Sequence, residues 1–113
     1  RTMLVILALV AVLLGAVPAL AAGDMIAALD YLQTQQNADG GFGSGFSPES
    51  TVGSTADAVL ATVSVGGDLA AFDQGGNTPL SYLVTNAASA ATGGDLAKLI
   101  QAAIAAGENP QPL

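Results

Sequence analysis

The sequence predicts an all-α protein, in which helical hairpins follow an N-terminal signal peptide. Three observations lead to this prediction: the first 22 residues are almost entirely apolar, four later alanine-rich stretches place apolar residues at helical spacing, and glycine or proline lies near the ends of those stretches. No later stretch alternates between apolar and polar residues as a strand would. At 113 residues the chain is at most one ordinary domain.

Residues 1–22 have the pattern of a secretory signal peptide. Arg1 precedes a continuous apolar run, and Ala19-Leu20-Ala21 supplies the small residues that signal peptidase requires. We expect cleavage after Ala21 or Ala22 and a secreted or cell-surface protein. The alternative is an uncleaved membrane anchor, because about 20 apolar residues are enough to span a bilayer.

The charge of the chain excludes nucleic acid as a partner. Loss of the leader would remove Arg1 and leave Lys98 as the only basic residue against nine acidic ones. Such a surface repels a phosphate backbone. The chain contains no cysteine, so hydrophobic burial without disulfides must hold an exported protein together.

The first predicted helix runs from about Met25 to Gln36. Asp24 lies at its start, where a carboxylate suits the helix dipole, and glycines from Gly40 onward end it. Its apolar face comprises Met25, Ile26, Leu29 and Leu32.

The second predicted helix begins at Ser54 and ends at Gly66-Gly67. Ser54-Thr55-Ala56-Asp57 has the form of a capping box with aspartate in place of glutamate, so Asp57 is interpreted as a helix-start residue. The core face comprises Ala56, Val59, Leu60 and Val63.

The third and fourth predicted helices have equally clear signals. Thr78-Pro79 opens the third with a hydroxyl cap and a proline at the first helical position, and Gly93-Gly94 ends it. The fourth starts at Asp95 and ends at Gly107, with Pro110 beyond. Their core faces comprise Leu80, Leu83, Val84 and Ala87 in the third helix, and Leu96, Leu99, Ile100 and Ala103 in the fourth.

The four helices form two similar pairs. Leu29-Asp30-Tyr31-Leu32 recurs 51 residues later as Leu80-Ser81-Tyr82-Leu83, and the closing glycines Gly66 and Gly107 are 41 residues apart. After the leader, residues 23–113 therefore divide into two hairpin repeats, at about 24–67 and 77–110. Because such units bury their faces on neighbours, we expect the chain to be an N-terminal part whose further repeats follow it.

Gln36 is predicted to be buried at a corner between helices. It lies four residues after Leu32, on the apolar face, where an amide needs partners or costs about 1–3 kcal/mol. Free backbone groups at the end of a neighbouring helix are the nearest suitable partners. Asp39-Gly40-Gly41 allows a sharp turn, and Phe42 can fold back over the junction. This account needs no ligand.

The same residues resemble a known repeat. Tyr31-Leu32 and Gln36 precede Gly40 and Phe42 with the spacing of the repeat in terpenoid cyclases, although tryptophan is usual there at the position of Phe42. Residues 36–43 are also similar to repeats of protein prenyltransferase β subunits and of cobalamin carriers such as transcobalamin and intrinsic factor. The resemblance implies part of an α/α toroid of the prenyltransferase/squalene-cyclase type. The motif residues are Tyr31, Leu32, Gln36, Asp39, Gly40, Gly41, Phe42 and Gly43.

The sequence predicts no catalytic residue, no cofactor and no metal site. The Asp-x-Asp-Asp cluster of class II terpenoid cyclases is absent, and the lack of cysteine and histidine excludes both a prenyltransferase zinc site and a Ser-His-Asp or Cys-His nucleophile. The only candidates for a calcium loop lack the alternating oxygen spacing. These candidates are Asn37, Asp39, Glu49 and Asp73.

We therefore expect an exported or cell-surface repeat module that binds an unknown small ligand or surface partner. One alternative is a carrier of cobalamin or another small ligand, and another is an enzyme of the cyclase or prenyltransferase type with its catalytic residues in the C-terminal part. Aromatic side chains can line a ligand cavity, although core packing is their more common role. The aromatic residues are Tyr31, Phe42, Phe46, Phe72 and Tyr82.

Overall fold

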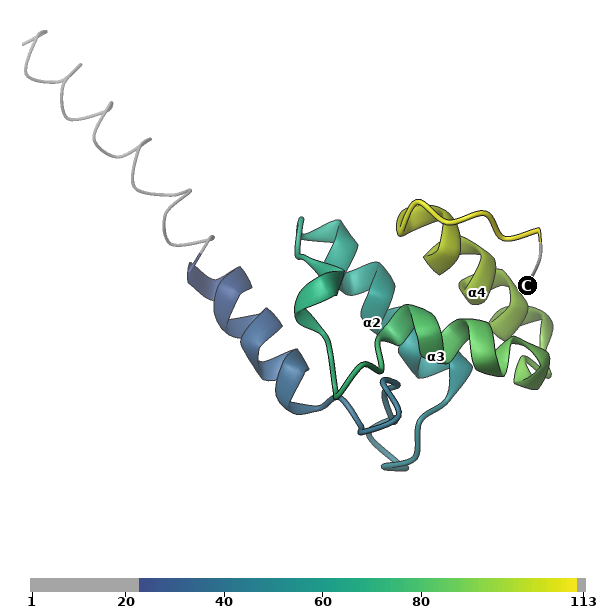
Figure 1. Ribbon diagram of the computed structural model, residues 1–113, viewed down its shortest axis with the longest axis horizontal. Helices are drawn as coiled ribbons and strands as arrows, with labels where there is room; N and C mark the ends of the chain where they lie inside the picture. The colour runs from purple at the N-terminus through teal and green to yellow at the C-terminus, as the bar shows by residue number, and fades with distance from the viewer. Residues whose placement is uncertain (1–22, 112–113) are drawn as a thin grey trace, which may run out of the picture. The chain divides into compact units, whose positions relative to one another are not determined.

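The computed structural model describes residues 23–111, which are mostly helical (Figure 1). Residues 23–34 are helical and are followed by α2 (Val52–Ser64), the short 3-10 helix η1 (Leu69–Ala71), α3 (Pro79–Asn86), the 3-10 helix η2 (Ala87–Ser89) and α4 (Gly93–Ala105). Within this range the chain forms isolated β-bridges but no strand, so the all-α prediction is confirmed.

The predicted signal peptide lies outside the described residues. None of the helices in the described part of the chain is long and apolar enough to cross a membrane. The chain divides into two units after Asp30. In the first, Met25 and Ile26 of the predicted apolar face are exposed. The second unit, from Tyr31 onward, contains α2, α3, α4 and the loops between them.

α2 begins at Val52, two residues before the predicted start at Ser54, because Thr51 and not Ser54 is its N-cap. Thr51 has an extended backbone, and its Oγ1 accepts a hydrogen bond of 3.1 Å from the Ser54 N–H. Ser54 thus supplies the donor of the cap. The interpretation of Asp57 as a helix-start residue is also wrong, since it lies in the second turn and pairs with Lys98.

The predicted glycine end of α2 is confirmed. Gly66 has a φ of +71°, and its N–H donates to the Val63 carbonyl while the Gly67 N–H donates to the Thr62 carbonyl. These two bonds define a Schellman motif, which needs a residue that tolerates the left-handed conformation.

α3 begins as predicted but ends well before Gly93-Gly94. Thr78 and Ser81 form a reciprocal capping box with Pro79 at the first helical position. The helix ends at Asn86, whose side-chain amide donates to the Tyr82 carbonyl, and tightens into η2.

Gly93-Gly94 opens α4, and the prediction that these glycines end the preceding helix is wrong. Thr92 Oγ1 accepts a hydrogen bond of 3.1 Å from the Asp95 N–H, so Thr92 is the N-cap and the helix starts two residues before Asp95.

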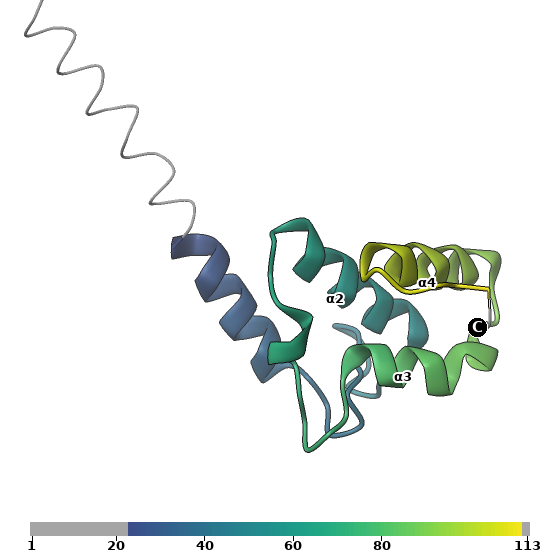
Figure 2. The ribbon, with the colours of Figure 1, turned by 45° about the horizontal axis from the view of Figure 1, so that its top comes forward.

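The core lies where α2 packs against α3 and α4, which flank it in Figure 2. The predicted face of α2 is confirmed, and Leu83, Leu99 and Ala103 are buried as predicted. Three predicted core positions are wrong, since Val84, Leu96 and Ile100 are exposed. The buried cluster comprises Val52, Ala56, Val59, Leu83, Leu99 and Ala102.

Candidate functional site

Gln36 lies just after the helical residues 23–34, which end two residues before the predicted boundary, and its side chain is buried as predicted. Its Nε2 donates to the Gly40 carbonyl at 3.0 Å and to the Phe72 carbonyl at 3.2 Å. Phe72 is the C-cap residue of η1, so a free carbonyl at a helix end is one of the partners. The amide therefore links the corner to a segment 36 residues further along the chain.

Gly40 and Asp39 shape the turn. Gly40 has a φ of +87°, and a Cβ there would lie 2.6 Å from the Thr78 carbonyl oxygen, so the turn packs directly against the cap of α3. Asp39 Oδ1 accepts from the Gly41 N–H at 2.9 Å and from the Ser50 hydroxyl at 2.7 Å.

Phe42 closes the corner on the side of α2. Its N–H donates to Thr55 Oγ1 at 3.0 Å, and its carbonyl accepts from the Thr51 N–H. Its ring lies edge-on against Phe72, with the centroids 6.1 Å apart. In the described range no buried side-chain nitrogen or oxygen lacks a partner. The polar groups of the corner are thus engaged within the protein, which supports a structural role.

The remaining motif and aromatic residues have different environments. Leu32 and Gly43 are half-buried, while Tyr31 is exposed. Phe46 is fully exposed in the turn between Ser44 and Ser47.

An open pocket of about 770 Å³ lies between the corner and α2. Of the five aromatic residues considered above as possible lining of a ligand cavity, Tyr31 and Phe42 line this pocket. The opposite wall is a face of α2 that we call the α2 outer face. It comprises Ser54, Asp57, Ala58 and Ala61.

A second surface lies on α4, where sequence reasoning placed the core. Leu96, Ile100 and Ile104 follow one another at four-residue spacing and are 47%, 45% and 61% exposed. We call these three residues the α4 stripe. An apolar groove of about 440 Å³, whose walls include Leu83, Val84 and Leu99, lies between α3 and α4. The sequence feature that indicates this exposed surface is that α4 carries apolar residues on more than one side.

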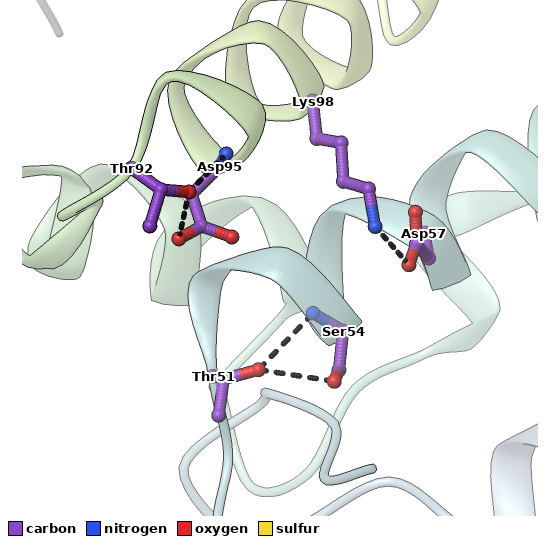
Figure 3. Close-up of polar contacts among 6 residues, drawn as sticks. All are labelled: Thr51, Ser54, Asp57, Thr92, Asp95 and Lys98. Atoms are coloured by element: carbon purple, nitrogen blue, oxygen red, sulfur yellow. Dashed lines mark hydrogen bonds and ion pairs between the residues drawn. The ribbon is translucent and has the colours of Figure 1, made fainter.

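α2 and α4 match residue by residue with an offset of 41. Both helices have 13 residues, both begin after a threonine cap, and both end at a left-handed glycine, Gly66 or Gly107. Figure 3 shows three corresponding pairs. These pairs are Thr51 and Thr92, Ser54 and Asp95, and Asp57 and Lys98.

The two helices also touch, and Asp57 and Lys98 do so at corresponding positions. Lys98 Nζ lies 2.7 Å from Asp57 Oδ2 (Figure 3), and a Cβ on Gly53 would lie 2.8 Å from Asp95 Oδ1. The hydrogen bond to Asp57, and its negative charge, raise the pKa of Lys98 above the usual lysine value. α2 and α4 therefore lie side by side with their N-termini at the same end.

Among residues 23–111, no group of three or more histidine, cysteine, aspartate or glutamate side chains is placed to hold a metal ion. Comparisons with family models, curated proteins and solved structures find no match to this chain. The features of this chain that resemble a repeat are the correspondence of α2 with α4 and the corner residues.

Proposed function

We propose that this chain is an exported or cell-surface interaction module built from α-hairpin repeats of the α/α-toroid type. The exposed α4 stripe is the observation that carries the proposal. Repeat units of this kind bury their apolar faces on the next unit, and an apolar stripe rimmed by polar residues marks an interaction surface. The polar residues of the corner, by contrast, are engaged in holding the fold together.

Site-specific cross-linking in the cells that make the protein tests this role. A photo-reactive amino acid at position 104, in the α4 stripe, is expected to give a discrete cross-linked species. The matched control carries the same amino acid at Ala70, an exposed position in η1. Absence of a species specific to position 104 would overturn the proposed function.

Export is tested separately, by mass spectrometry of protein recovered outside the cell. Cleavage after Ala21 or Ala22 predicts a mature chain that begins at Ala22 or Gly23. A chain that keeps the leader and fractionates with membranes would instead support the uncleaved anchor.

The open pocket beside the corner supports a second candidate, a carrier of a small ligand. Tyr31 offers an exposed ring there and Gln35 an exposed amide, a combination common in ligand sites. Titration of the full chain with a corrinoid tests the cobalamin version of this role. An unchanged corrinoid absorption spectrum, together with no shift in protein melting temperature, would exclude it.

A further inference from the structure

We propose that the α4 stripe binds the α2 outer face of a second copy of this chain, so that copies stack end to end. This inference rests on the proposed interaction role and names the partner.

The counterpart of the α4 stripe is buried in the same molecule. Forty-one residues earlier, Leu96, Ile100 and Ile104 correspond to Thr55, Val59 and Val63 of α2. Thr55 and Val59 are 0% exposed, and Val63 packs against the core. The second hairpin, α3 and α4, covers Val59 and Val63, because Leu83 and Leu99 belong to the cluster that contains Val59. Thr55 is bonded instead to the Phe42 N–H of the corner. The α4 stripe thus presents the apolar surface that another such hairpin would cover.

The face suited to cover it is partly open on α2, where Asp57 and Ala61 are exposed and Ala58 is buried. α4 packs on α2 through Leu99 and Ala102, with Lys98 beside them. The corresponding residues 41 positions earlier are Ala58, Ala61 and Asp57, and all three line the open pocket. The α4 stripe therefore corresponds to the side of α2 that faces α4, and the α2 outer face corresponds to the side of α4 that faces α2. Two copies could repeat between them the contact that α2 and α4 make within one molecule.

The charges favour this pairing. Within one molecule, Lys98 pairs with Asp57 at the corresponding position of the neighbouring helix. Stacking in the same register brings the Asp57 of a second copy to the open side of Lys98. A cation between two carboxylates reduces the repulsion between chains whose net charge is −7.

The contact is heterologous, because it joins different surfaces of the two copies. Such contacts leave one free surface of each kind and generate either open filaments or closed rings. Assembly size is therefore expected to rise with concentration and is not limited to a dimer unless a ring closes.

Two blocking variants of the full chain test the proposal by sedimentation velocity over a concentration series. Ile100→Glu places a charge in the α4 stripe, and Ala61→Glu does the same in the α2 outer face. Each is expected to weaken self-association by roughly tenfold or more, as expected for a residue at the centre of an interface. An equimolar mixture is expected to form heterodimers, because each variant keeps the surface that the other lacks.

Phe46→Glu is the matched control, since it replaces a fully exposed apolar residue in a loop and should associate as the wild type does. Circular dichroism shows whether each variant remains folded. A charge-swapped protein, Asp57→Lys with Lys98→Glu, should associate with itself more strongly than either single variant does.

Three results would overturn the proposal. The first is a wild-type chain that stays monomeric up to about 1 mM, a concentration at which even weak specific contacts form. The second is wild-type-like association of Ala61→Glu, which would indicate a symmetric contact between two α4 stripes. The third is a cross-link from position 104 to a different protein alone, which would leave the proposed interaction role intact.

Discussion

At the residue scale, Gln36 shows how one side chain holds distant segments together. Its amide satisfies the carbonyls of Gly40 and Phe72 inside the protein. Gln36→Ala is expected to lower the free energy of unfolding by about 1–3 kcal/mol, because buried carbonyls lose their donor. Urea denaturation followed by circular dichroism measures the change. The neighbouring variant Gln35→Ala removes only an exposed bond to Thr34 and should change stability by less than about 0.5 kcal/mol.

Gly40 gives a second test at this scale. Gly40→Ala is expected to destabilise the fold by more than about 2 kcal/mol, since a positive φ is unfavourable for alanine and the methyl group would meet the Thr78 carbonyl. Gly45→Ala is the control, because no atom lies within 4 Å of a Cβ there. Equal melting temperatures for the two variants would contradict the packing of the turn against α3.

The phenol of Tyr82 makes the stability of the fold depend on pH. Its hydroxyl donates to the Ser50 carbonyl at 2.8 Å, and burial, followed by the charge of Asp39, raises the pKa of Tyr82 above the usual tyrosine value. The folded state thus holds the phenolic proton more strongly than the unfolded state, so this stabilisation is complete below about pH 10 and is lost as the pH rises through the folded-state pKa.

Tyr82→Phe should therefore be less stable than the wild type by about 1 kcal/mol near neutral pH, because the hydrogen bond is lost. The difference should shrink as the pH rises above about 10. Urea midpoints of both proteins across this range measure it. A difference that stays constant with pH would show that the raised pKa does not contribute to stability.

At the element scale, the caps of α2 and α4 determine where these helices begin. Thr51→Ala and Thr92→Ala are each expected to lower stability by about 1 kcal/mol, because each removes the acceptor of a helix-start N–H. Ser54→Ala should have a smaller effect, since the Ser54 backbone N–H is the donor to the cap. Thermal unfolding measures the loss of stability in each of the three variants. A larger loss for Ser54→Ala than for Thr51→Ala would support the helix start predicted from the sequence.

The helix ends show what the sequence can predict. Gly66 and Gly107 were placed correctly, because few residues other than glycine take the left-handed conformation that closes a helix. The start of α2 was misplaced, since Thr51 and Ser54 are both good caps three residues apart. The helix-breaking pair Gly93-Gly94 predicts the end of a helix, whereas the preceding Thr92 caps α4 and makes these glycines its first residues.

Partners distant in sequence were harder to predict. The burial of Gln36 followed from local spacing, but its bond to Phe72 depends on where η1 ends. The buried side of α4 could not be chosen from periodicity, because Leu96 and Leu99 lie on two apolar faces of one helix. Only the position of α2 decides which of them is covered.

At the scale of the whole molecule, the same substitution at corresponding positions of α2 and α4 should change stability by very different amounts. Val59→Asp buries an unpaired carboxylate and is expected to prevent cooperative folding. Ile100→Asp places the same group on an exposed surface and should leave the circular dichroism spectrum unchanged. Similar destabilisation by both variants would contradict the exposure of the α4 stripe.

Self-association also predicts how stability depends on concentration. The wild-type melting temperature should rise with protein concentration, because association of folded chains removes them from the unfolding equilibrium. The melting temperature of Ile100→Glu should be almost independent of concentration. Calorimetry should cover a hundredfold range of protein concentration. Mass action over that range corresponds to roughly 2.7 kcal/mol, which is enough to detect the difference.

The matching caps and equal lengths of α2 and α4 have a consequence for how a protein of this kind could become longer during evolution. Each follows a threonine cap and is closed by a glycine, and both residues lie 41 positions from their counterparts. Tandem duplication of a DNA segment of that length would add a complete unit whose surfaces match those already present. Lengthening by gene duplication would then keep the caps and helix ends in register, which gives repeats of this kind a simple evolutionary route to larger arrays.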